Sequence, residues 1–256
     1  MVYRDDSRGY RNTSLALGSF VLLFTIMLFV RPVIDDLLDR AALTTETGAK
    51  TTLTNDPLIG PMMVTIRDRF PEDFTRIITN VNADVGAIGE VGVGAGLVRD
   101  IDAIVVRDRH WMTRAPGAAL AAVRDSELAV LLRLQRTNPT ICADFGETGT
   151  TKQRLSPETG GLMLTLREKI LLAIAAGRDT PVAERRPTPA AVAAAQARLR
   201  ETLSTTVQSS QARELLTGER TPERALPMHR CELQIALRYA LTSVGAETAD
   251  LLMTAP

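Results

Sequence analysis

Aromatic residues and net charge are both scarce in this chain of 256 residues. Only 4% of the residues are aromatic, and the 30 basic side chains are balanced by 30 acidic ones. Proteins that hold single strands combine a basic groove with aromatic side chains on which bases stack, and a basic surface steers duplexes. The chain has neither an aromatic cluster nor a basic run, so we expect no nucleic-acid partner.

The common catalytic signatures are missing as well. No GxSxG or HExxH motif occurs, and only two histidines, His110 and His229, could serve a nucleophile. His229 stands two residues before Cys231, and side chains at that spacing on a helix point in different directions. The many acidic residues offer no reason to select a catalytic pair. The sequence therefore assigns no catalytic residue.

Two stretches resemble cofactor motifs but fail on spacing. In GAIGEVGVGAGLV, residues 86–98, Leu97 stands where a dinucleotide fingerprint requires its third glycine. In FGETGTTKQ, residues 145–153, Thr151 stands directly before Lys152, where a phosphate loop would require glycine. We expect no cofactor. Gly92 and Gly96 have instead the spacing of a small-residue helix face that packs against another helix.

A long uncharged run near the N-terminus predicts a membrane anchor. The stretch SLALGSFVLLFTIMLFV covers residues 14–30, with no polar face, and a membrane-spanning helix needs about 20 apolar residues. Pro32 and Asp35 follow, without the small-residue pattern of a signal-peptidase site. We therefore expect an uncleaved signal-anchor over 13–34 after a short tail, 1–12. A cleaved signal peptide and a buried helix are the alternatives.

Basic residues near this run give its orientation. Three arginines precede it and two follow soon after it, which favours a cytoplasmic N-terminus under the positive-inside rule. Arginine far outnumbers lysine and alanine is abundant, as is typical of GC-rich bacterial genomes. We expect a single-pass protein of a bacterial inner membrane, with its C-terminal domain in the periplasm.

The remaining chain has the pattern of a helical domain. Residues 35–56 contain a threonine-rich stretch without apolar periodicity and predict a linker. In residues 57–256, prolines at first helical positions and apolar stripes at helical spacing recur, whereas alternating β patterns are few. The predicted fold is all-α: a transmembrane helix followed by a multi-helix bundle.

The two cysteines predict a disulfide. Cys142 comes just after a helix expected over 118–137, and Cys231 lies near the start of one expected over 228–252. The end of one helix and the start of its antiparallel partner share one end of a bundle, and an oxidising compartment would allow them to pair. Two buried free thiols, or a metal site with the two histidines, remain alternatives; no metal ligand is assigned.

These features favour a binding protein over an enzyme. We expect a membrane-anchored helical domain that serves as a protein-interaction or structural component of the bacterial cell envelope, with another envelope or membrane protein as its partner. One alternative is an envelope hydrolase that uses a carboxylate pair. A second is a regulatory domain that faces the cytoplasm.

Overall fold

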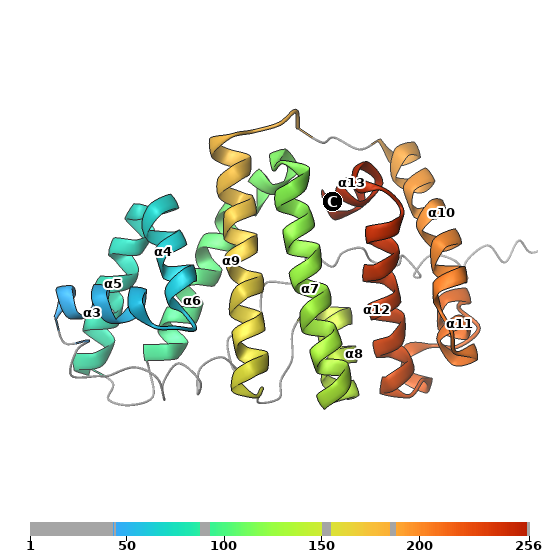
Figure 1. The fold of residues 1–256 in the computed structure, drawn as a ribbon, viewed down its shortest axis with the longest axis horizontal. Coiled ribbons are helices and arrows are strands. Elements are labelled where there is room, and N and C mark those ends of the chain that lie inside the picture. The colour runs from blue at the N-terminus through green and yellow to red at the C-terminus, as the bar shows by residue number, and fades with distance from the viewer. Residues whose placement is uncertain (1–42, 44, 88–92, 150–154, 185–187, 255–256) are drawn as a thin grey trace, which may run out of the picture.

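The chain folds into a row of α-helices, as the sequence predicts. The computed structural model describes residues 43, 45–87, 93–149, 155–184 and 188–254. Within these ranges it contains 11 α-helices, α3 to α13, and no strand (Figure 1). The predicted tail and the predicted anchor, residues 13–34, lie outside them. None of the helices described is both long and apolar enough to cross a membrane.

The helices form three neighbouring groups (Figure 1). The first contains α3 (Glu46–Asn55), α4 (Gly60–Arg69), α5 (Pro71–Ala87) and α6 (Val93–Asp108), followed by the 3-10 helix η5 (Arg109–Arg114). The central group contains α7 (Gly117–Thr137), α8 (Pro139–Thr148) and α9 (Pro157–Asp179). The last contains α10 (Pro189–Thr206), α11 (Ser210–Thr217), the 3-10 helix η6 (Pro222–Arg224), α12 (Pro227–Ser243) and α13 (Ala246–Thr254). Helix α9 packs against α4 and α7, and α12 packs against α7, α8 and α10.

Local capping signals explain where several helices begin. The side chains of Asn138, Ser156 and Thr188 accept hydrogen bonds from the first turns of α8, α9 and α10. Each of these residues is followed by a proline, whose fixed φ suits the first helical position. Of these three starts, the one at Thr188 agrees with the helix that the sequence predicts from Pro189 onwards.

Two segments at the ends of the described chain differ from the sequence expectation. Residues Glu46–Asn55 fall in the expected linker but form α3, because Ala49 and Leu53, one turn apart, are fully buried. The helix expected over 228–252 is broken into α12 and α13. Gly245 lies between them with φ of 92°, a left-handed conformation that ends a helix and that few residues other than glycine adopt.

Helix α12 joins two hydrophobic cores. The larger core is built by α3 to α9, together with Cys231 and Ile235 from α12. The smaller core lies among α10 to α13 and includes Leu237 and Leu241, also from α12. Opposite sides of α12 therefore hold the C-terminal group against the rest of the molecule, and α13 adds Met253 to the larger core and the buried pair of Asp250 with Arg124.

The predicted disulfide is present. Cys142 and Cys231 are bonded, with their Cα atoms 5.3 Å apart, and both residues are fully buried. Cys142 lies within α8 rather than in a loop after a helix, and Cys231 lies near the start of α12. At Gly146 a side chain would overlap that of Gln234, so α8 and α12 cross closely beside the bond. The bond is consistent with an oxidising, extracytoplasmic compartment.

Candidate functional site

An open hollow lies along α12, and three parts of the fold line it. Its volume is about 820 Å³. Leu132 and Gln135 of α7 and Pro139 of α8 form one side, and residues at the junction of α10 and α11 form the other. Helix α12 runs between them and contributes Met228, His229, Glu232, Ile235, Ala236 and Tyr239.

The residues from α12 share one helical face. Met228, Glu232, Ile235 and Tyr239 follow at i, i+4, i+7 and i+11, a spacing that aligns side chains along a helix. Ile235 is buried, whereas Met228 is 55% and Tyr239 44% exposed. Two large apolar side chains therefore stand open to solvent on either side of a buried apolar position.

A polar cluster of Ser209, His229 and Glu232 lies on the side of the hollow near α11. The Ser209 hydroxyl caps α11 by accepting a hydrogen bond from the backbone of Ala212, and it lies 3.2 Å from Nδ1 of His229. One carboxylate oxygen of Glu232 accepts hydrogen bonds from the backbone N–H groups of Gln208 and Ser209, at 3.2 and 2.9 Å. Glu232 thereby fixes the start of α11 against α12.

This cluster does not have the geometry of a catalytic triad. In a triad, one ring nitrogen of histidine contacts the nucleophile and the other contacts the acid. Here Ser209 and Glu232 both approach the same nitrogen, Nδ1 of His229, the carboxylate at 3.8 Å. The arrangement therefore positions the helices and does not form a proton relay from serine to acid.

Hydrogen bonding keeps Glu232 ionised at the edge of the hollow. Partial burial raises the pKa of this carboxyl, but the hydrogen bonds from Ser209, Gln208 and His229 outweigh it and lower the pKa below its ordinary value. The hollow therefore carries a negative charge near neutral pH.

The buried carboxylates elsewhere have structural partners. Asp102 pairs with Arg167, Glu127 with Arg238, and Asp250 with Arg124, in each case across two helices. Asp100 accepts a hydrogen bond from the Asn80 amide, and Asp73 binds Arg76 and Arg107. Each of these five acids thus contacts a basic or amide side chain, and most of the contacts join two helices.

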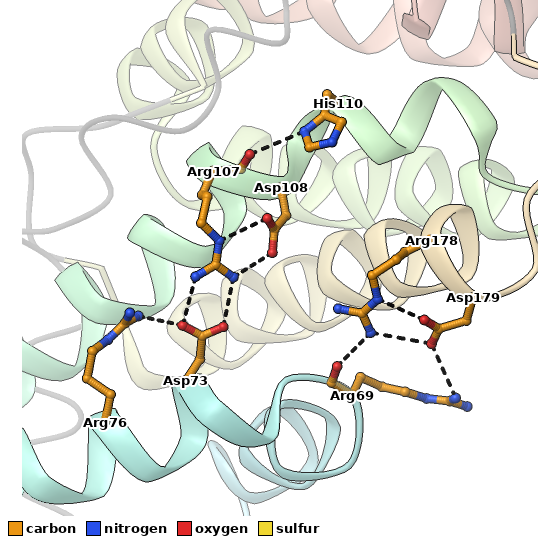
Figure 2. A network of polar contacts seen from close by, with 8 residues as sticks. All are labelled: Arg69, Asp73, Arg76, Arg107, Asp108, His110, Arg178 and Asp179. Atoms are coloured by element: carbon orange, nitrogen blue, oxygen red, sulfur yellow. Dashed lines mark hydrogen bonds and ion pairs between the residues drawn. The ribbon is translucent and has the colours of Figure 1, made fainter.

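Two acids do come close together, where the start of α5 lies beside the end of α6. Figure 2 shows Arg107 between Asp73 and Asp108; it binds Asp73 through two nitrogens, at 3.0 and 2.8 Å, and also binds Asp108. The hydrogen bond from Arg107 lowers the pKa of Asp108. The guanidinium occupies the space that a substrate would need between two catalytic carboxyl groups, so this pair is an ion-pair clamp.

A second clamp in the same region joins α4 to α9. Arg178 donates to Asp179 and to the backbone carbonyl of Arg69, and its guanidinium lies 4.8 Å from the centre of the Phe70 ring (Figure 2). Nearby, Nδ1 of His110 lies 3.3 Å from the carbonyl of Arg107. The two histidines of the chain thus belong to different regions.

The glycine pair of the sequence analysis is described only in part. Gly96 lies in α6, buried against α5, where a side chain would overlap the carboxylate of Asp84. Gly92 lies outside the described residues, so the shared packing face stays a prediction. The sequence analysis considers His229 as a possible base or metal ligand, but it does not predict that Ser209 and Glu232 lie beside it. The spacing of His229 and Glu232, one turn apart, was the available signal.

No protein family, curated protein or solved structure matches this chain. The fold and the hollow along α12 are therefore the features that indicate its function.

Proposed function

We propose that this chain is a membrane-anchored interaction protein of the bacterial cell envelope, and that its helical domain binds a partner protein in the hollow along α12. The observation that carries this proposal is the exposed apolar pair Met228 and Tyr239, which flanks the buried Ile235 on one helical face. Aromatic and methionine side chains that stay exposed on a folded domain are typical of interaction surfaces.

The setting of the hollow supports a binding role. Helix α12 is tied to the larger core by the Cys142–Cys231 bond and by the buried pair of Arg238 with Glu127. A surface built on a helix held in this way changes little on binding, so little conformational entropy is lost when a partner docks. The disulfide also supports placing the domain outside the cytoplasm, against the alternative of a cytoplasmic regulatory domain.

The hydrolase alternative has less support. Each of the five buried acids of the described residues has a basic or amide partner, and the two neighbouring acids Asp73 and Asp108 are bridged by Arg107. A carboxylate pair that acts on a substrate needs one acid free to give or take a proton.

Site-specific photocrosslinking in the native membrane tests the proposal. A photoreactive residue at Met228 or at Tyr239 of the full chain should crosslink to the same partner protein. The matched control is the same residue at Glu72, an exposed position on α5 far along the chain from the hollow. Crosslinks at Glu72 that equal those at Tyr239, or none at either α12 position, would contradict a partner site in the hollow.

A further inference from the structure

The charge of the hollow narrows the kind of partner that it fits. Among the residues that line it, Glu232 is the only acid, and neither lysine nor arginine occurs. The nearest basic neighbour in the chain, Arg230, is already held by Glu147 and lies close to Asp144. No lysine or arginine of α12 therefore pairs with Glu232; its ionisable neighbour on this helix is His229, whose Nδ1 lies 3.8 Å away.

The same charge pattern excludes some occupants. An anionic lipid surface and a nucleic acid are attracted by lysine and arginine, and both would meet an acid here instead. An apolar segment without a cation would bury the ionised carboxylate of Glu232 with only backbone N–H donors and the ring of His229 beside it, and no permanent positive charge, which is costly. A complementary occupant brings one basic side chain to the middle of an apolar contact.

The shape of the site favours a helix as this occupant. The described residues contain no strand, so the hollow offers no sheet edge to which an extended peptide could add. Its α12 side runs from Met228 to Tyr239, about 16 Å or three helical turns at 1.5 Å per residue. A second helix laid along it would repeat side chains at the same i, i+4, i+7 and i+11 spacing.

We propose that the hollow binds an amphipathic helix of a partner protein in which a single lysine or arginine faces Glu232 and apolar residues face Met228, Ile235 and Tyr239. This inference rests on the proposed function, because it names the chemistry of the partner at the same site. The basic residue sets the register of the helix, and the apolar residues supply the buried area.

Binding of designed helical peptides to the full chain, purified in detergent, tests this inference. The probes are peptides of about four turns with apolar residues at i, i+7 and i+11 and with lysine, glutamine or glutamate at i+4. Fluorescence anisotropy should give an affinity about tenfold higher for the lysine peptide than for the glutamate peptide, and the difference should shrink in high salt.

Two substitutions separate the charge from the apolar contact. Glu232→Gln keeps an acceptor for the N–H groups of Gln208 and Ser209, so the fold should persist while the preference for lysine is lost. Glu201→Gln, at an exposed acid of α10 that does not line the hollow, should keep the preference. Tyr239→Ser should lower the affinity for the lysine and glutamine peptides by the same factor. Thermal unfolding of each variant should show that it is folded.

The outcomes distinguish this inference from the broader function. Three outcomes would overturn the inference that the occupant is a helix with a basic residue. They are equal affinity for the lysine and glutamate peptides, no binding of any peptide, and a preference for lysine that survives in Glu232→Gln. If Tyr239 nevertheless crosslinks to a partner in the membrane, the proposed function stands with a different ligand. A Tyr239 crosslink to a second copy of this chain would also overturn the inference.

Discussion

At Gly177 the backbone of α9 lies directly against that of η5. A Cβ atom there would overlap the carbonyl oxygen of Trp111 and would lie 2.8 Å from its carbon atom. A side chain can move away by changing its rotamer, but backbone atoms cannot. To accommodate the added Cβ atom, α9 and η5 would have to separate. We expect Gly177→Ala to lower the free energy of unfolding by about 1–3 kcal/mol, measured by denaturant unfolding of the full chain in detergent.

Gly161, in the same helix, is the matched control for that substitution. A Cβ atom there would lie 3.4 Å from Cδ2 of Leu58, an ordinary van der Waals contact. Alanine is favoured over glycine within a helix by up to about 1 kcal/mol, so Gly161→Ala should leave stability unchanged or raise it. Equal losses in the two variants would show that the close approach at Gly177 is not the cause.

The buried acid Asp102 predicts a pH dependence of stability. Burial raises the pKa of Asp102 above its ordinary value, although the charge and hydrogen bond of Arg167 act against this rise. A raised pKa in the folded state means that this carboxyl favours folding at low pH and that its contribution is lost as the pH rises through the folded-state pKa. Relative to Asp102→Asn, the natural protein should therefore lose stability between about pH 4 and pH 7. Denaturant unfolding of both proteins at the two pH values measures this, and a relative gain by the natural protein would mean that Arg167 dominates.

Such buried pairs could not have been predicted from the sequence. Rules for neighbouring residues on a helix find partners three or four positions apart, whereas Arg167 and Asp102 are 65 residues apart and Arg238 and Glu127 are 111 apart. The same holds for the hollow, because Ser209 meets His229 from 20 residues away. The residue types were visible, but their pairing depends on how the helices pack.

At the scale of helices, local sequence signals predict more of the structure than they do for the buried residue pairs. The start of α10 follows from Thr188, which caps this helix and precedes a proline. Helix α3 was not expected, because its few apolar residues do not form a stripe; burial of Leu53 in the larger core compensates. The disulfide was predicted because helix ends and redox chemistry limit where two cysteines can meet, although α8 itself was not foreseen.

Loss of the bond between α8 and α12 should be costly. Its cysteines are separated by 89 residues, and closing a loop of this length restricts the unfolded chain by about 4.6 kcal/mol in the loop-entropy model. We expect the double variant Cys142→Ala, Cys231→Ala to lose stability of this order in denaturant unfolding. Because both cysteines are fully buried, a thiol reductant should reduce the natural protein only after denaturant is added, as alkylation and mass measurement can show. Two thiols that alkylate without reductant would contradict the bond.

At the scale of the whole molecule, the anchor remains the prediction on which the proposed location depends. The uncharged run at residues 14–30 should keep the full chain in membranes after carbonate extraction, and deletion of residues 1–35 should release a soluble domain. Immunoblots of the fractions measure both. A mature protein from the native membrane that begins after residue 30 would instead identify a cleaved signal peptide.

The Cys142–Cys231 bond also determines what a protease could do to this molecule. Cys142 precedes, and Cys231 follows, the connection between the end of α9 at Asp179 and the start of α10 at Pro189. A single cut in that connection would divide the polypeptide in two, yet the pieces would remain one covalent molecule with α12 still bonded to α8. Nicked protein would therefore run as two bands only after reduction, and α12, with the hollow along it, would stay attached to the central helices after the chain is cut.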